Sequence, residues 1–189
     1  MKRLLAAVLL LTVLVATGFR FKPQDPIAHT LASTVRIEAM TADEDAKPVI
    51  CTGFMVAPRR AVTAAHCVPN DVGFTVDGED ALVLMRNPFF ALISAGDKPS
   101  LQFANKLKIQ EPVIAFGYAW GDMFVFGRQV ATIKDGDFAM DGPLAPGMSG
   151  GPTVNQAGEV VGLNQAANNV IGIVCGAGEI QEFLSASPR

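Results

Sequence analysis

Short apolar runs separated by turns make up most of the chain after residue 33. Val35 and Ile37 alternate with the charged residues Arg36 and Glu38, and a period of two is typical of a half-buried strand. Dipeptides that favour turns, such as DG at 135–136 and 141–142, separate later runs. The pattern therefore predicts a body of many short strands. The expected strands cover residues 35–38, 49–56, 61–65, 74–76, 81–85, 113–118, 124–133, 152–155, 159–165 and 170–175.

Only the C-terminal end has the period of a helix. Ile180, Phe183 and Leu184 lie at positions i, i+3 and i+4, which gives residues 179–184 one apolar stripe. The chain also has 18 glycines and 12 prolines in 189 residues, too many helix breakers for a helical bundle. A break near residues 96–101 divides the strands almost evenly. We therefore expect an all-β fold of two packed antiparallel barrels or sheets with a short C-terminal helix.

The first 18 residues have the pattern of a secretory signal peptide. The basic start MKR is followed by an apolar run at residues 4–16, in which Thr12 is the only polar residue, and then by small residues at 16–18. The alternative is an uncleaved membrane anchor, but a helix of this length reaches only about 20 Å across a hydrocarbon core of roughly 30 Å. We expect an exported protein, periplasmic or secreted, that meets a membrane only if residues 4–16 are retained as an anchor.

Three segments follow from this interpretation. We expect residues 1–18 to be the signal peptide or N-terminal anchor, residues 19–32 to be a linker with Pro23 and Pro26 as breakers, and residues 33–189 to be the folded domain. Export also places the domain in an oxidising compartment, where cysteines can pair.

Composition excludes several classes of protein. Hydrophobic residues make up 50% of the chain and charged residues 17%, which excludes a disordered polyelectrolyte. The net charge is −3 and no long basic run is present, so we expect no nucleic-acid partner. The only two histidines are His29 and His66, too few for a histidine-based zinc site. We expect neither a metal nor another cofactor.

Two reactive side chains stand out from this background. His66 ends an apolar run, TAAHC at residues 63–67, and Ser149 lies among small residues in GMSGGP at 147–152. Such a loop can turn sharply, expose the Ser149 hydroxyl and direct backbone N–H groups to one point, as acyl transfer requires. A serine hydroxyl needs a base, and an imidazole with a pKa near 6.5 is suited to that role. Taken singly, His66 could instead be a hydrogen-bonded core histidine and Ser149 a turn residue.

These motifs carry a family resemblance. TAAHC at 63–67, DALV at 80–83 and GMSGGP at 147–152 occur in the order His, Asp, Ser, and the chain resembles the trypsin/chymotrypsin superfamily of serine peptidases. The segments 113–118, 127–130 and 158–164 are similar to its bacterial stress-protease branch, and the similarity runs from about residue 35 to 184. The resemblance implies two antiparallel β-barrels with the site between them. It implies that His66 is the general base, Asp80 the residue that orients it, Ser149 the nucleophile, and the N–H groups of Gly147 and Ser149 the oxyanion hole.

The cysteines fit the same family. The resemblance implies a disulfide between Cys51 and Cys67 that holds the histidine loop. Cys175 is then left without a partner in an apolar strand, where a buried inert thiol is expected.

The chain also departs from the family pattern. Only 13 residues separate His66 from Asp80, so the first barrel must be trimmed, and Asp77 and Asp71 remain candidates for the orienting carboxylate. Met148 precedes the serine where activated zymogens have an aspartate, and no matching N-terminus is found, so we expect no zymogen switch. No peptide-binding module of the stress-protease branch is expected after the terminal helix.

The specificity pocket implied by the resemblance is neutral. Pro143 stands six residues before Ser149, where trypsin-like members have an aspartate, and Asp141 is the nearest acidic alternative. We therefore expect little preference for cleavage after Arg or Lys. The expected substrate-binding residues are Pro143, Gln165, Ala166, Ala167 and Ile173.

The sequence thus favours a serine endopeptidase that hydrolyses protein or peptide substrates through a His-Asp-Ser triad and an acyl-enzyme. The main alternative is a protease-like binding module that does not cut. An esterase is disfavoured because PTVN at 152–155 would break the helix that an esterase elbow requires. The sequence assigns no oligomeric state.

Overall fold

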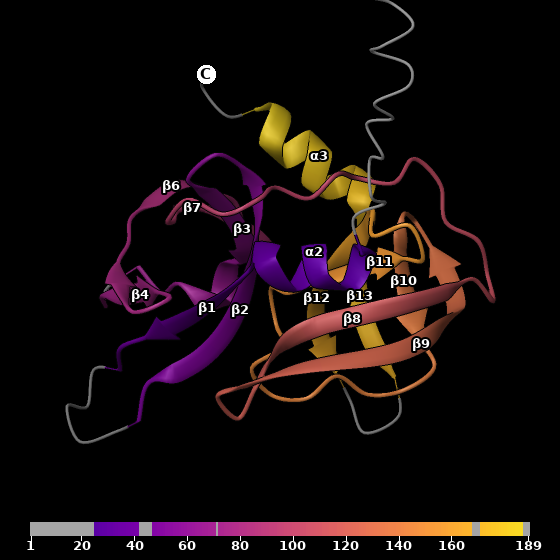
Figure 1. The fold of residues 1–189 in the computed structure, drawn as a ribbon, viewed down its shortest axis with the longest axis horizontal. Coiled ribbons are helices and arrows are strands. Elements are labelled where there is room, and N and C mark those ends of the chain that lie inside the picture. Colours follow the sequence, from indigo (N-terminus) through magenta and orange to yellow (C-terminus); the bar gives the residue numbers. More distant parts are fainter. Residues whose placement is uncertain (1–24, 42–46, 71, 168–170, 187–189) are drawn as a thin grey trace, which may run out of the picture.

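Two β-structures joined in sequence form the body of the protein (Figure 1). The structure is a computed structural model that describes residues 25–41, 47–70, 72–167 and 171–186, the side chains of 166 and 167 excepted. The expected signal peptide, 1–18, lies outside the described residues.

The elements of the first half are α2 (Pro26–Ser33), β1 (Thr34–Ala39), β2 (Val49–Ala57), β3 (Arg60–Ala64), the 3-10 turn η1 (Ala65–Cys67), β4 (Phe74–Val76), β5 (Glu79–Asp80), β6 (Val83–Arg86) and β7 (Phe90–Ser94). Those of the second half are β8 (Pro112–Ala119), β9 (Asp122–Lys134), β10 (Asp137–Met140), β11 (Pro152–Asn155), β12 (Val160–Ala167), β13 (Gly172–Gly176) and α3 (Ala177–Ser185).

The first half is a curled sheet that does not close. Its seven strands follow the order β5-β4-β1-β2-β3-β7-β6, with antiparallel neighbours throughout. The alternation of Val35 and Ile37 with Arg36 and Glu38 is preserved, because both aliphatic side chains are fully buried while the charged ones are half-exposed. Because this sheet stays open, the expected trimming of the first barrel is confirmed.

The second half closes into a barrel of six strands in the order β10-β13-β12-β11-β8-β9. The terminal helix α3 contacts β12 and β13 of the second half, and its Phe183 ring lies 5.6 Å from the Phe90 ring of β7 in the first half. One hydrophobic core, which includes Phe54 and Phe90 of the first half and Leu163 of the second, continues across the junction. The expected all-β architecture of two barrel-like units with a C-terminal helix is confirmed.

A second helix lies where the sequence indicated only a linker. Pro26 occupies the first turn of α2, a position where its missing N–H costs nothing, and the Asp25 side chain accepts a hydrogen bond from the N–H of Ile27 at 3.0 Å. The expectation that Pro26 acts as a breaker within residues 19–32 is therefore wrong. Among the described residues, neither helix is long and apolar enough to cross a membrane.

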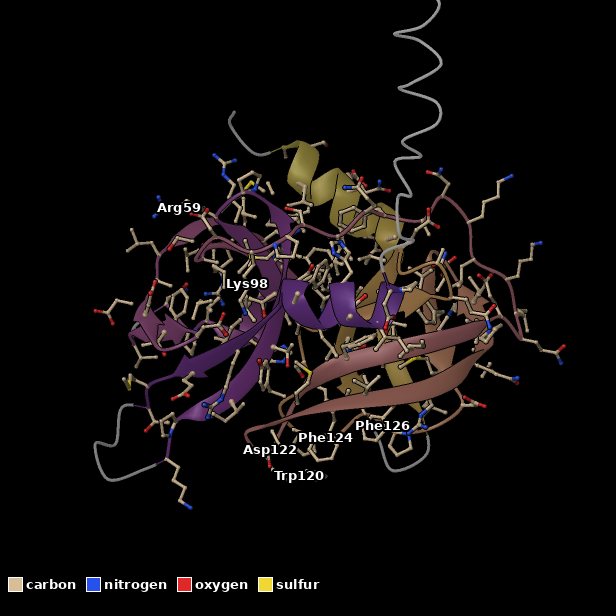
Figure 2. The ribbon with its side chains drawn as sticks, viewed as in Figure 1. Arg59, Lys98, Trp120, Asp122, Phe124 and Phe126 are labelled. Carbon is tan, nitrogen blue, oxygen red and sulfur yellow. A yellow bond between two sulfur atoms is a disulfide. The ribbon has the colours of Figure 1, made fainter. Side chains whose placement is uncertain are left out.

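Aromatic side chains form a row along the β8–β9 hairpin, in which Phe124 and Phe126 are partly buried against the core of the barrel. Figure 2 shows Trp120, Phe124 and Phe126 following one another along the lower edge of the barrel. The ring centroids of Trp120 and Phe124 are 5.6 Å apart, and those of Phe124 and Phe126 are 5.9 Å apart. The Arg128 guanidinium covers Phe126 at 4.9 Å from its centroid, whereas Trp120 remains 71% exposed.

Candidate active site

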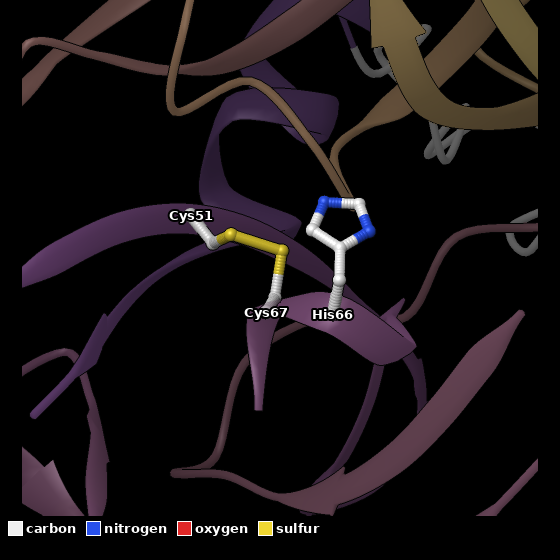
Figure 3. A group of neighbouring side chains, drawn as sticks. All are labelled: Cys51, His66 and Cys67. Carbon is white, nitrogen blue, oxygen red and sulfur yellow. A yellow bond between two sulfur atoms is a disulfide. The ribbon is translucent and has the colours of Figure 1, made fainter. Parts of the chain in front are cut away.

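The turn η1 presents His66 at the end of strand β3. Ala65 and Cys67 on either side are buried, while His66 points outward from the turn (Figure 3). Strand β3 pairs with β2 on one side and β7 on the other, so its end has a fixed position at the junction of the two halves. The fold therefore holds the backbone of His66 while leaving its imidazole accessible.

Four further contacts fix this turn. The Arg86 guanidinium donates to the carbonyls of Ala65 at 2.9 Å and Val68 at 2.6 Å, which flank His66. The N–H of Ala65 donates to the Phe89 carbonyl at 2.9 Å. Cys67 forms a disulfide with Cys51 of β2, as the resemblance implied. The turn is thus bound to β2, β6 and the start of β7.

Partial burial lowers the pKa of His66 below its ordinary value of 6.5. Desolvation disfavours the protonated imidazolium, so the ring is neutral at pH 7 and can accept a proton.

The loop that carries Ser149 lies against the same corner. The Ser149 carbonyl accepts a hydrogen bond from the Thr52 N–H at 2.9 Å and lies 3.5 Å from Cys67 Sγ. The Ser149 hydroxyl donates to the Gln165 carbonyl at 3.2 Å. The structure therefore brings the residue beside His66 into contact with Ser149, although the two lie in different halves of the fold.

The backbone before Ser149 has the features of an anion-binding loop. Gly147 has φ 98°, and an added Cβ would overlap the Tyr118 carbonyl oxygen, so only glycine fits. The Met148 carbonyl accepts from the Gly151 N–H at 3.1 Å. Because a trans peptide directs its C=O and N–H oppositely, the N–H of Ser149 points away from that bond. Within the described part of the chain, the N–H groups of Gly147 and Ser149 donate to no backbone carbonyl.

The structure does not bring Asp80 to the imidazole. Asp80 lies on β5, pairs with Thr75, and lines a small surface cavity with Arg59 and Ser94. Ser94 pairs with Arg60 at the start of β3, whereas His66 follows its end. The five residues of that strand span about 13 Å, so the two groups lie at opposite ends of it. The orienting role expected for Asp80 has no support in this placement.

Asp77 and Asp71 were the alternative candidates for the carboxylate that orients His66. The Asp77 carboxylate accepts from the Arg36 N–H at 2.9 Å and pairs with Lys98 at 2.7 Å, so it is held in the turn between β4 and β5. Asp71 lies outside the described residues. The strand beside the histidine turn is β7, whose first residue, Phe90, and the residue before it, Phe89, are both aromatic.

Comparisons with known proteins agree with this geometry. Residues 51–163, more than half of the chain, match the family model described as a trypsin-like peptidase domain. The chain belongs to the trypsin-like peptidase family. Serine-type endopeptidase activity is the activity of this family, so the expectation from the sequence is confirmed at that level. A comparison with curated protein sequences found no match.

Solved structures of bacterial serine proteases share the fold. The Rv3671c protease of M. tuberculosis in its inactive form is 24% identical with a TM-score of 0.72, over 87% of this chain and 93% of that chain. Its active form is 23% identical with a TM-score of 0.73, over 87% and 85%. The serine endoprotease from Yersinia pestis is 16% identical with a TM-score of 0.74, over 89% and 67%.

The segments expected to line the specificity pocket of this trypsin-like peptidase lie close together. Ala166 and Ala167 of β12 pair with Ile173 and Gly172 of β13. An added Cβ on Gly172 would lie 2.9 Å from Leu144 Cγ, which places the segment containing Pro143 against the same strand. Ile173 is 40% exposed, and the Gln165 side chain donates to the Phe89 carbonyl at 3.1 Å. The Asp141 carboxylate accepts from the Gln129 N–H at 2.6 Å and is thereby held on β9.

Two groups of potential metal ligands occur among the described residues. Cys51, His66 and Cys67 form one, but both sulfurs are joined in the disulfide. Asp137, Cys175 and Glu179 form the other, and here burial, followed by the two carboxylates, raises the pKa of Cys175 to about 12. The thiol therefore stays protonated at neutral pH.

We predict that Cys175 does not react in the folded peptidase. A pKa of about 12 leaves a negligible thiolate fraction at pH 8, and the side chain is only 6% exposed. Iodoacetamide should leave the native protein unmodified for hours and should modify Cys175 alone after unfolding without reductant, as measured by intact mass. Rapid modification of the native protein would contradict this burial.

Proposed function

We propose that this peptidase is an exported serine endopeptidase in which His66 is the general base and Ser149 the nucleophile. The observation that supports it best is the contact between the two catalytic segments, since the Ser149 carbonyl lies 3.5 Å from Cys67 Sγ and is bonded to the Thr52 N–H. The Cys51–Cys67 disulfide supports action in an oxidising compartment outside the cytoplasm.

The reaction has two halves. The Ser149 hydroxyl turns from the Gln165 carbonyl towards the imidazole, gives its proton to His66 and attacks the scissile carbonyl carbon. The N–H groups of Gly147 and Ser149 bind the oxyanion of the tetrahedral intermediate. His66 then gives the proton to the leaving amine, which breaks the C–N bond and leaves an acyl-enzyme. Water, deprotonated by His66, hydrolyses that ester and regenerates Ser149.

The test of this function is covalent labelling by a fluorophosphonate probe. The probe should lose fluoride and transfer its phosphonyl group to Ser149 of the wild-type protein. Peptide mass spectrometry identifies the modified residue. The Ser149→Ala variant is the matched control and should remain unlabelled. If the wild-type protein stayed unlabelled and hydrolysed no peptide, the proposed peptidase function would be excluded.

That outcome would favour a protease-like binding module. The placement of Asp80 on β5, away from His66, is the one observation that supports this second function. A catalytic imidazole needs an acceptor on its other nitrogen to keep the productive tautomer. A binding module would retain the fold and the loop but show neither labelling nor turnover.

We predict activity that persists in mildly acidic solution. The neutral imidazole is the active form, and burial lowers the pKa of His66 below 6.5. The acidic limb of kcat/KM against pH should therefore have its midpoint below 6.5, so that activity declines only at more acidic pH. Initial rates on a neutral peptide at constant ionic strength measure it. A midpoint above 6.5 would indicate a negative charge beside the ring.

We also predict a neutral specificity pocket formed by Pro143, Gln165, Ala166, Ala167 and Ile173. No acidic side chain lies among these residues, and the Asp141 carboxylate accepts a hydrogen bond from the Gln129 N–H. A peptide library should give cleavage after small to medium apolar residues, with Arg and Lys at that position cleaved at least about tenfold less efficiently. A profile dominated by Arg or Lys would refute the assignment.

A further inference from the structure

Thr52 of β2 has an unusual set of buried contacts. Its side chain has no exposed surface, and its hydroxyl makes two hydrogen bonds across the junction of the two halves. Thr52 Oγ1 donates to the Gly147 carbonyl at 2.8 Å and accepts from the Tyr118 N–H of β8 at 2.8 Å. The hydroxyl therefore links the first sheet to the closed barrel and to the loop before Ser149.

The backbone of the same residue holds the other side of that loop. The Thr52 N–H donates to the Ser149 carbonyl at 2.9 Å, and the Thr52 carbonyl accepts from Thr63 Oγ1 of β3 at 2.6 Å. Strand β3 leads directly into the turn that carries His66. One residue thus contacts the loop at both Gly147 and Ser149 and also contacts the strand of the histidine.

We propose that Thr52 is a positioning residue for the oxyanion hole, an inference that rests on the proposed function of this loop. Its hydroxyl and its N–H fix the carbonyls of Gly147 and Ser149, the two residues whose N–H groups would bind the oxyanion. With both carbonyls held, the peptide group between them, which carries the Ser149 N–H, has little freedom to rotate, and Gly147, which carries the other donor, is held beside it. Preorganised donors of this kind act mainly on the transition state.

The hydroxyl is what separates this role from ordinary packing. Thr34 of β1 is a matched comparison, because it is also fully buried and its hydroxyl makes one bond, to the Thr30 carbonyl of α2 at 2.7 Å. Replacement of either threonine by valine removes the hydroxyl and nearly preserves the shape. Only the change at Thr52 releases a carbonyl of the nucleophile loop.

The experiment compares steady-state kinetics of Thr52→Val, Thr52→Ser and Thr34→Val on one peptide. We expect Thr52→Val to lower kcat by about 10- to 100-fold with KM changed less than about threefold, since a small misplacement of catalytic donors has costs of this size. Thr52→Ser keeps the hydroxyl and should stay within about threefold of wild type, as should Thr34→Val. Wild-type kcat in Thr52→Val, or an equal loss in Thr34→Val, would overturn the proposal.

A second measurement separates this inference from the proposed function. Amide hydrogen exchange across residues 147–151 should be faster in Thr52→Val than in wild type or Thr34→Val, whether or not the protein cuts peptides. Unchanged exchange there would overturn the inference while leaving Ser149-dependent hydrolysis intact. If Thr52→Val fails to fold, Thr52→Ser against Thr52→Ala makes the same comparison, because these two variants differ only by the hydroxyl.

Discussion

Replacement of Ser149 by alanine is expected to lower kcat on a peptide substrate by at least about 10⁴-fold. The change removes the atom that would form the acyl-enzyme and leaves the N–H donors of the loop in place. The fold should persist, because the hydroxyl makes a single described bond, 3.2 Å to the Gln165 carbonyl. The free energy of unfolding should change by less than about 1 kcal/mol. Progress curves at high enzyme concentration, together with thermal unfolding, measure both quantities.

His66→Ala provides the control for this prediction. Nucleophile and base act as a unit, so the loss in His66→Ala should be similar, and the double variant should be little worse than either single one. Independent, multiplying losses would contradict a joint role of the two residues. If Ser149→Ala kept the turnover of wild type, Ser149 would have no role in the reaction.

Replacement of Gly150 by alanine is expected to destabilise the fold by about 3 kcal/mol or more and to abolish activity with it. Gly150 has φ 84°, and an added Cβ would overlap the Thr52 carbonyl oxygen and Thr63 Oγ1. It would also lie 2.9 Å from the Ala64 N–H nitrogen. Strands β2 and β3 would have to move apart, and β3 positions His66. Urea unfolding followed by circular dichroism measures the loss.

Gly78→Ala is the matched control for the backbone contribution. Gly78 has φ 87°, but nothing lies within 4 Å of an added Cβ. This variant should therefore lose only the left-handed backbone cost of about 1–2 kcal/mol and keep its activity. If Gly150→Ala were no less stable than Gly78→Ala, the loop of Ser149 would not be packed against β2 and β3 as described.

Patterns that depend on neighbouring residues predicted much of the fold. The alternation around Val35 places it on a buried face of β1, and the stripe of Ile180 and Phe183 packs α3 against the core. The glycine-rich segment around Ser149 does form a tight loop, with Gly147 and Gly150 at positive φ. In each case the information lies within a few residues, so a single sequence suffices.

Positions set by pairing between distant strands could not be predicted in this way. The family resemblance of DALV at 80–83, with an acidic residue at the head of an apolar run, led to Asp80. That run forms β5 and β6 at opposite edges of the sheet, and the strand beside β3 is β7. Strand β7 was not among the expected strands, although the apolar run FALI at 90–93 follows Asn87 and Pro88, residues that favour turns.

Helix α2 illustrates a different limit of pattern reasoning. Pro26 can end a helix or begin one, and only the preceding residue distinguishes the two cases. Asp25 supplies the side-chain acceptor for the first N–H groups, which was the available signal for a helix start. The helix also depends on tertiary packing, since an added Cβ on Gly158 would lie 2.9 Å from Pro26 Cβ.

The aromatic row on the β8–β9 hairpin also determines what fluorescence would report. Trp120 is the only tryptophan of the chain, and it directly follows Ala119, whose Cα lies 3.5 Å from the position of a Cβ on Gly147. The indole emission of the protein therefore originates at the turn between β8 and β9, where the exposed ring contacts Phe124. It offers an intrinsic optical signal for changes at this hairpin that requires no attached dye.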